Sequence, residues 1–256
     1  TDPNAITQSP FDQKLTASDG AEFDFFGQSV SVSGDTAVIG ASLSGSAYVY
    51  VRSNGVWTEQ QKLAASDASE NDDFGRSVSI SGDTVVIGSN NNGAGSAYVY
   101  VRSDSVWTEQ QKLTASDAAG GDQFGASVSI SGDTAVMGAY RDEDNGTDSG
   151  SAYVYVRSNG VWSEQQKLTA GDGAQDDQFG FSVSISGDTA VIGAWFGDDN
   201  GPESGAAYVY VRSNGVWSEQ QKLTASDAAE YDQFGFSVSI SGNTVVVGAY
   251  GDENLT

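Results

Sequence analysis

Two acidic segments carry the residue types best suited to binding a hard cation. At 142–148, oxygen donors occupy alternate positions around a glycine, and 198–203 has a related composition. The candidate ligands are six carboxylates: Asp142, Asp144, Asp148, Asp198, Asp199 and Glu203. Oxygen donors of this kind are the ligands that Ca²⁺ prefers in proteins. Neither segment has EF-hand spacing, so two interpretations stand: a calcium site, or a solvated turn rich in Asp, Asn and Gly.

Aromatic residues stand beside the same segments. Trp195 and Phe196 lie just before the second one, and Tyr140 and Tyr250 follow the same Gly-Ala dipeptide that precedes Trp195. A ring next to acids and Asn is typical of sites that bind a pyranose through its apolar face. These four aromatic residues are therefore candidates for binding a glycan.

The composition excludes several kinds of function. Of 256 residues, 35 are Asp or Glu and 11 are Lys or Arg, giving a net charge of -24. Such a surface repels nucleic acid and anionic lipid and favours cations or basic partners, although a saline habitat also selects acidic surfaces. The chain has no His and no Cys, so the usual general base and the thiol nucleophile are absent. No apolar stretch approaches the ~18 residues that a membrane span needs. We therefore expect no enzyme, no nucleic-acid partner and no membrane insertion.

The elements that position these candidates belong to a repeat. A segment of the form Phe-Gly-x-Ser-Val-Ser-(Ile/Val)-Ser-Gly-(Asp/Asn)-Thr occurs five times in the chain. The copies begin at Phe26, Phe74, Phe124, Phe179 and Phe234. Repeats of this length indicate an array of similar supersecondary units, which form one cooperative body.

One copy predicts four strands. Small polar and β-branched residues alternate at 127–131, an apolar run follows at 134–139, and aromatic and β-branched residues fill 152–156. Asn159-Gly160, a strong hairpin signal, leads into a fourth strand at 162–168. Four antiparallel strands repeated radially form a β-propeller. We therefore predict an all-β fold, a single propeller over 1–256 with about five four-stranded antiparallel blades.

The ends of the chain predict how the propeller closes. A strand at 11–17 resembles the fourth strand of a copy, and the fifth copy ends after its second strand at 244–250. The N-terminal strand is therefore expected to complete the last blade. The fifth copy still lacks a third strand, which either 5–7 or another chain would have to supply. An open sheet edge tends to recruit a partner strand.

These motifs resemble the FG-GAP repeat family, whose best-known members form the head of integrin α subunits. Phe124-Gly125 supplies the FG, and Gly138-Ala139-Tyr140 and Gly193-Ala194-Trp195 stand at the GAP position. Integrin-like propellers typically have seven blades, whereas this chain has five copies. They also carry calcium loops between the first two strands, where this chain has only the short connection 131–134. The resemblance therefore implies the fold but not the family's calcium site.

Acidic residues concentrate on one predicted rim of the propeller. The loops that enter the first and third strands carry 24 of the 35 acids. Two recurring residues have structural interpretations. An Asp two residues before each Phe-Gly is expected to cap the turn into the strand: Asp24, Asp72, Asp122, Asp177 and Asp232. One Trp per copy is expected to fill the core between blades: Trp57, Trp107, Trp162 and Trp217.

The function that fits this acidic, variable rim is a non-catalytic extracellular binding or adhesion module. Its partner would be a glycan, a protein or a surface bridged by a cation. The alternative is a structural building block of a cell-surface layer or filament, in which copies of the chain join through the incomplete fifth blade. Calcium is the only cofactor that the sequence indicates.

Overall fold

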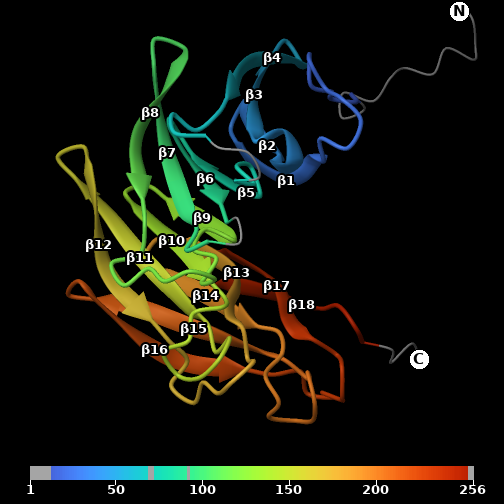
Figure 1. Ribbon diagram of the computed structural model, residues 1–256, viewed down its shortest axis with the longest axis vertical. Helices are drawn as coiled ribbons and strands as arrows, with labels where there is room; N and C mark the ends of the chain where they lie inside the picture. Colours follow the sequence, from blue (N-terminus) through green and yellow to red (C-terminus); the bar gives the residue numbers. More distant parts are fainter. Residues whose placement is uncertain (1–12, 69–71, 91–92, 253–256) are drawn as a thin grey trace, which may run out of the picture.

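The computed structural model describes residues 13–68, 72–90 and 93–252, which form five antiparallel sheets (Figure 1). We call the sheets units 1 to 5 in chain order. Strands that are consecutive in sequence are neighbours in every sheet. Units 1 to 4 have four strands each, and unit 5 has two. The fold is all-β, as predicted, and the strands of the five units correspond to the five sequence copies.

The strands have the following bounds. Unit 1 contains β1 (Phe26–Ser33), β2 (Thr36–Ala41), β3 (Ser46–Ser53) and β4 (Val56–Leu63). Unit 2 contains β5 (Ser77–Ser81), β6 (Thr84–Ser89), β7 (Ser96–Ser103) and β8 (Val106–Leu113). Unit 3 contains β9 (Ser127–Ser131), β10 (Thr134–Ala139), β11 (Ser151–Ser158) and β12 (Val161–Leu168). Unit 4 contains β13 (Phe179–Ser186), β14 (Thr189–Ala194), β15 (Ala206–Ser213) and β16 (Val216–Leu223). Unit 5 contains β17 (Phe234–Ser241) and β18 (Thr244–Ala249).

Helix is nearly absent from the described residues. The single helical element is a short 3₁₀ turn, η1 (Ser42–Ser44). No helix in the described part of the chain has the length and apolar character needed to cross a membrane.

Local turn chemistry fixes the pairing within a unit. Asn159 and Gly160 have φ values of 52° and 78°, as a tight hairpin turn of type I′ requires. The β11–β12 ladder that follows has one irregularity, between Val154 and Tyr155, and the same irregularity recurs in units 1, 2 and 4. Strand β10 is buried along its whole length, as its apolar sequence predicted.

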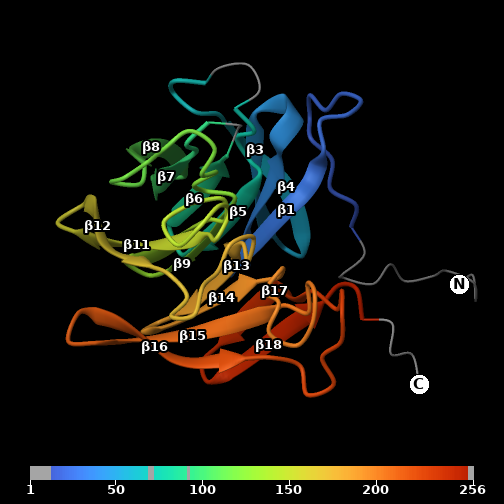
Figure 2. The same cartoon turned by 60° about the horizontal axis from the view of Figure 1, so that its bottom comes forward.

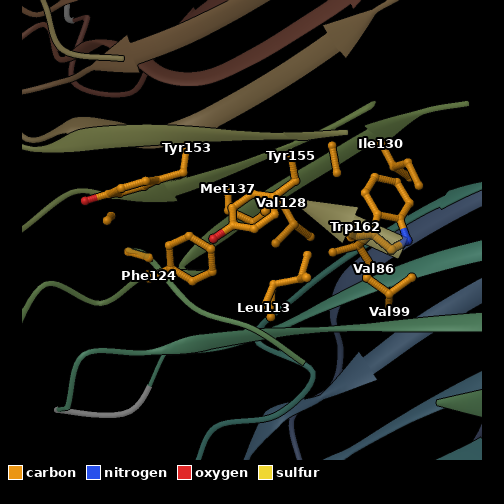
Figure 3. Close-up of a cluster of buried hydrophobic side chains, with 14 residues drawn as sticks. Val86, Val99, Leu113, Phe124, Val128, Ile130, Met137, Tyr153, Tyr155 and Trp162 are labelled. Atoms are coloured by element: carbon orange, nitrogen blue, oxygen red, sulfur yellow. The ribbon is translucent and has the colours of Figure 1, made fainter. Parts of the chain in front are cut away.

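The units stand around a common axis in the manner of a propeller. In Figure 2 the first strands of units 2 to 5 gather toward the middle of the molecule, and the fourth strands β8, β12 and β16 lie outside. The hydrophobic core is accordingly a series of interfaces between neighbouring sheets. Figure 3 shows one of them, where Val86, Val99 and Leu113 of unit 2 meet residues of unit 3. From unit 3 come Phe124, Val128, Ile130, Met137, Tyr153, Tyr155 and Trp162.

Three of the four recurring tryptophans fill these interfaces, as predicted, whereas Trp57 of unit 1 is only partly buried. Trp107, Trp162 and Trp217 are each 2% exposed. The indole N–H of Trp162 donates to Gln110 Oε1 of the preceding unit at 3.1 Å. Its backbone N–H donates to Gln111 Oε1 at 2.9 Å, and Gln111 Nε2 donates back to the Trp162 carbonyl at 2.8 Å. Each outer strand is therefore joined to the next by a reciprocal glutamine contact.

The alternating serines join the inner strands of successive units. The backbone N–H groups of Ile130 and Gly132 donate to Ser79 Oγ and Ser81 Oγ of the preceding unit, both at 3.1 Å. The polar face of this alternating strand therefore contacts the next sheet, where the period-2 pattern alone indicated only that one face is packed. Burial and polar pairing thus act together at every junction.

A glycine in each second strand permits this close approach. A Cβ atom at Gly138 would lie 1.8 Å from the carbonyl oxygen of Gly180 in the next unit. At Gly88 the corresponding distance, to the Gly125 oxygen, is 1.9 Å. The invariant Gly of the Gly-Ala step therefore sets the spacing between neighbouring sheets.

The N-terminal segment lies against unit 1 rather than in the last sheet. Gln13 makes the reciprocal contact with Trp57, donating to its carbonyl at 2.8 Å and accepting from its N–H at 2.8 Å. The carbonyl of Thr16 accepts a hydrogen bond from Tyr50 at 2.8 Å. In units 2 to 4 these contacts come from the preceding outer strand and the residue after it, as from Gln61 and Ala64 to unit 2. Residues 13–19 therefore occupy the place of an outer strand that precedes unit 1.

The prediction that this strand completes the last blade is wrong for the described residues. Residues 13–17 form no strand, and β17 pairs only with β18. The valines on the outer sides of units 1 and 5 also remain exposed, so the two ends do not cover each other. The physical reason is that the spacing between sheets, set by their close packing, leaves five units in an open arc. The proposed substitute strand at 5–7 lies outside the described residues.

Replacing Gly138 with Ala should weaken the junction between units 3 and 4. The new methyl group would collide with the backbone carbonyl of Gly180, which, unlike a flexible side chain, cannot move away easily. We therefore expect the free energy of unfolding, measured by urea denaturation, to fall by at least about 2 kcal/mol. Gly248→Ala is the matched control, because the nearest atom to its Cβ is Ser237 Oγ of the same unit, at 2.5 Å. Equal losses in the two variants would contradict the role of glycine in spacing the sheets.

Candidate binding site on the loop rim

The acidic loops form one continuous surface, which we call the loop rim. It consists of the loops that enter each first strand and the loops that join each second strand to the third. Backbone hydrogen bonds join loops of successive units. The N–H groups of Asp176 and Gln178 donate to the carbonyls of Thr147 and Asp148 at 2.8 and 3.0 Å. Contacts between neighbouring units therefore stabilise the loops of the rim as well as the sheets.

The recurring Asp before Phe-Gly has the capping role that the sequence predicted. Asp122 Oδ2 accepts the backbone N–H of Ala119 at 2.7 Å. Asp24, Asp177 and Asp232 make the same contact within their own loops at 2.6 to 2.7 Å. Burial raises the pKa of Asp122 and of Asp177 above the ordinary carboxyl value. These acids hold the loop conformation.

In unit 3, three carboxylates surround one ammonium group. Lys167 Nζ lies 2.7 Å from Asp117 Oδ2, 2.9 Å from Asp142 Oδ2 and 2.5 Å from Asp144 Oδ2. Burial by itself would lower the pKa of Lys167, but hydrogen bonds to the three carboxylates outweigh it and raise that pKa. Lys167 therefore remains charged well above neutral pH.

Asp142 is the buried member of this cluster. It is 3% exposed, and its carboxylate also accepts hydrogen bonds from Ser151 Oγ at 3.0 Å and from the Tyr153 hydroxyl at 2.7 Å. Partial burial would raise the pKa of Asp117, but hydrogen bonds from Lys167 and Tyr153 lower it below the ordinary value. At the centre of the cluster, the buried carboxylate of Asp142 is therefore neutralised by Lys167 of the same unit.

The structure brings together part of the predicted metal-ligand set. Asp142 and Asp144 offer oxygens within 4.8 Å of each other and of Asp117, which sequence reasoning missed. The available signal was an aspartate that recurs at the same place in each copy, as at Asp19, Asp67 and Asp172. Those aspartates pair with Lys62, Lys112 and Lys222, the counterparts of Lys167. Every complete unit therefore has one such lysine–aspartate pair, and the acidic segment 142–148 adds two further carboxylates to the pair in unit 3.

The second acidic segment has different contacts. Asp199 forms an ion pair with Lys222, and Asp198 Oδ1 accepts the backbone N–H of Glu203 at 2.8 Å. Glu203 Oε2 accepts a hydrogen bond from Gln233 Nε2 at 2.9 Å. Among the described residues, three acidic side chains close enough to share an ion occur only at Asp117, Asp142 and Asp144. Calcium at 198–203 stays a prediction that rests on sequence alone.

A negatively charged cavity opens beside the lysine cluster. Its volume is about 420 Å³. Six acids and one base line it: Asp117, Asp122, Asp142, Glu143, Asp144, Asp148 and Arg141. Two loops form its walls, one before the first strand of unit 3 and one after its second strand. The cavity favours cations and hydrogen-bond donors such as hydroxyl groups.

The four aromatic candidates belong to a larger group of rings, the aromatic row. Trp195 stacks on Phe196 at 3.9 Å and on Phe181 at 4.6 Å between ring centroids. Tyr250 stacks on Phe236 at 4.7 Å. The row consists of Tyr140, Phe181, Trp195, Phe196, Phe236 and Tyr250, which come from units 3, 4 and 5.

Sequence reasoning missed Phe181 and Phe236. The signal was the residue after each Phe-Gly, which varies where the rest of the motif does not: Gln28, Arg76, Ala126, Phe181 and Phe236. Four of these positions and Tyr140 line a second cavity, of about 240 Å³, where first strands of units 1 to 4 begin. The aromatic row therefore starts at the mouth of the central axis.

Exposed aromatic side chains are confined to the loop rim in the described part of the chain. They are Phe23, Phe25, Tyr231 and Tyr250. Tyr250, at the end of the aromatic row, is 74% exposed. The opposite rim carries the exposed valines of the hairpins, one per complete unit, such as Val161. Aromatic and acidic groups thus share one face of the molecule.

Comparison with protein families gives one match. The model of the FG-GAP repeat matches residues 11–50, 57–100, 107–155, 162–210 and 217–255. These five segments cover most of the chain. A search among curated proteins found no match.

Lys167→Gln should destabilise the protein far more than the same change in unit 2. It would leave the buried Asp142 without a counter-charge, so we expect a loss on the order of 3 kcal/mol in the free energy of unfolding. Lys112→Gln is the matched control, since Lys112 pairs with the exposed Asp67 and should contribute less than about 1 kcal/mol. Urea denaturation measures both variants, and equal losses would show that the three-carboxylate cluster adds no special stability.

Proposed function

The chain belongs to the FG-GAP repeat family, and we propose that it is a non-catalytic, extracellular binding module that recognises carbohydrate on its loop rim. The observation that carries this proposal is that the exposed aromatic side chains of the described residues all lie on the acidic rim. The resemblance to integrin heads, which act at cell surfaces, supports the extracellular location.

The aromatic row supplies the apolar half of a sugar site. A pyranose ring presents C–H groups on one face, and an exposed aromatic ring is a suitable platform for that face. Tyr250 is the ring best placed to contact a sugar, because most of its side chain is exposed. One face of the ring stacks on Phe236, and the other face is the one that a pyranose would contact. Phe196 extends the platform along the rim, and Trp195 supports it by stacking on both Phe196 and Phe181.

Polar groups beside the aromatic row supply the other half. The Tyr140 hydroxyl donates to Gln123 Oε1 at 2.6 Å, and Trp195 Nε1 donates to Gln178 Oε1 at 2.8 Å. These amides hold the rings in place, and Gln178, which is only partly buried, keeps further hydrogen-bonding capacity for a ligand. Nearby carboxylates accept hydrogen bonds from hydroxyl or amino groups. The negative rim therefore favours neutral or amino sugars over acidic ones.

The contacts of the rim acids support a non-catalytic role. Glycoside hydrolysis needs a proton-donating carboxyl group and a second carboxylate at a set separation from it. Here Asp142 is neutralised by Lys167, and Asp122 accepts a backbone hydrogen bond that shapes its loop. The same capping contact recurs in four units, which is typical of a structural feature of the repeat.

Removing the rings should remove sugar binding. We expect Tyr250→Ala and Trp195→Ala each to weaken retention on immobilised neutral or amino polysaccharides by about tenfold, which corresponds to about 1.4 kcal/mol. Val216→Ala, on the opposite rim, is the control and should bind as the unaltered protein does. Thermal melting checks that the variants remain folded.

Two outcomes would contradict the carbohydrate proposal. One is that the unaltered protein is retained by none of a panel of neutral, amino and acidic polysaccharides. The other is that the double variant Tyr250→Ala, Trp195→Ala is retained as well as the control.

Calcium enters this proposal as a competitor of Lys167. The family's calcium loop does not fit here, because β9 and β10 are joined only by Gly132 and Asp133. An ion at 142–148 would have to displace the ammonium group from between its carboxylates. We therefore propose that calcium binds this segment only weakly while Lys167 is in place.

The lysine variant tests the calcium hypothesis directly. Millimolar calcium, compared with a chelator, should raise the melting temperature of Lys167→Gln more than that of the unaltered protein, because an ion bound only to the folded state stabilises it. If neither protein responds, the calcium hypothesis for Asp142, Asp144 and Asp148 fails.

A further inference from the structure

We propose that the cavity at the mouth of the central axis, which we call the axis cavity, binds a sugar residue that carries a carboxylate group. It has a volume of about 240 Å³ and is lined by Gln28, Arg76, Ala126, Tyr140 and Phe181. These residues come from units 1 to 4, each of which has four strands. Such a subsite rests on the carbohydrate-binding function proposed above and adds to it the chemical class of one sugar residue.

Arg76 brings a positive charge to the axis cavity that no aspartate neutralises. Of the eleven basic residues, eight form ion pairs with aspartates: Arg52, Lys62, Arg102, Lys112, Arg157, Lys167, Arg212 and Lys222. The exposed side chain of Arg76 forms neither an ion pair nor a hydrogen bond with any residue that the structure describes. Its guanidinium group, with five N–H donors, is therefore available to a ligand.

Gln28 supplies a second donor group to the axis cavity. Its Oε1 accepts a hydrogen bond from Ser42 Oγ, which fixes the orientation of the amide. The two N–H groups of Gln28 Nε2 then have no acceptor within the described part of the chain. An arginine and an amide offer a carboxylate a charged and a neutral donor for its two oxygens.

Aromatic side chains form another part of the lining. Tyr140 meets Phe181 edge to face, with 5.4 Å between ring centroids, and Phe181 stacks on Trp195 at 4.6 Å. Gln123, which is 8% exposed, accepts the Tyr140 hydroxyl at 2.6 Å. These contacts hold both rings in place. Fixed rings suit the C–H groups of a pyranose, so the lining favours a carboxylate that is attached to a sugar ring.

Ala126 leaves the space that a ligand would fill. The residue after Phe-Gly is polar in units 1 and 2 and aromatic in units 4 and 5, and only unit 3 has a side chain as short as alanine there. The cavity, at about 240 Å³, is smaller than the roughly 300 Å³ at which pockets for drug-sized ligands begin. It therefore suits one sugar ring rather than an oligosaccharide.

The charge of the whole chain limits which acidic glycan can bind. A net charge of -24 repels a polyanion at long range, whereas a single carboxylate beside Arg76 gains a charge-assisted hydrogen bond. One carboxylate-bearing residue in an otherwise neutral or amino-substituted glycan satisfies both conditions. The preference of the loop rim for neutral or amino sugars thus applies to the polymer, and the carboxylate is recognised at one position.

Titration of the full chain with glucuronate, followed by NMR, tests the axis cavity by itself. Glucose is the matched probe, because it has a hydroxymethyl group where glucuronate has the carboxylate. We expect glucuronate to bind at least about tenfold more tightly than glucose, since only glucuronate forms the charged hydrogen bond with Arg76.

Two variants test the site in different ways. Arg76→Gln should raise the dissociation constant for glucuronate at least about tenfold, to near that for glucose. Ala126→Phe should abolish binding by filling the cavity, and it should fold because units 4 and 5 have Phe at the same position. Arg52→Gln is the control, since it removes an equal charge from an exposed ion pair on the opposite rim and should bind glucuronate normally. Thermal melting checks that each variant is folded.

Several results would overturn the proposal. They are glucuronate that does not bind or binds no better than glucose, Arg76→Gln that binds it as the unaltered chain does, and Arg52→Gln that weakens binding equally. A blocked glutamate that binds as tightly as glucuronate would also overturn it, in favour of an acidic side chain of a protein partner. Retention of neutral polysaccharides involves no carboxylate, so a failure of the axis cavity is distinguishable from a failure of the aromatic row.

Discussion

The whole structure depends on the close approach of one sheet's glycine to the backbone of the next. At Gly138 the neighbouring carbonyl lies where a Cβ would be, and this distance lets valines interdigitate and serines reach backbone N–H groups across the junction. A single four-stranded unit cannot bury both of its faces, so its stability comes from its neighbours. The loops of a unit can therefore vary without loss of the fold, provided that the residues at its junctions with neighbouring units stay the same.

The loop rim shows how charged residues are added to such a scaffold. Every complete unit pairs a lysine of its fourth strand with an aspartate of the preceding loop. Unit 3 adds Asp142 and Asp144 around the same ammonium group, so Lys167 holds an acidic loop in place. Charge is thereby concentrated on one face, next to the rings of the aromatic row.

The aromatic row and the exposed valines Val30 and Val246 use the same repeat in two ways. Phe181 and Phe236 replace small or polar residues at a position that faces the axis, and so create a surface that changes from unit to unit. Val30 and Val246 do the opposite, because they keep the residue of the internal junctions at places where no neighbour covers them.

The strands, their turns, the buried tryptophans and the capping aspartates could be predicted from the sequence, because they depend on residues close together within one copy. Only the tertiary structure showed that Lys167 stands among three carboxylates, since Asp117 is 50 residues away from it. The same holds for the joining of six rings into one row and for the position of 13–19 on unit 1. Such contacts are set by how closely and at what angle one sheet packs on the next. That spacing results from the close approach of a glycine in one copy to the backbone of the next copy. No pattern within one copy specifies it.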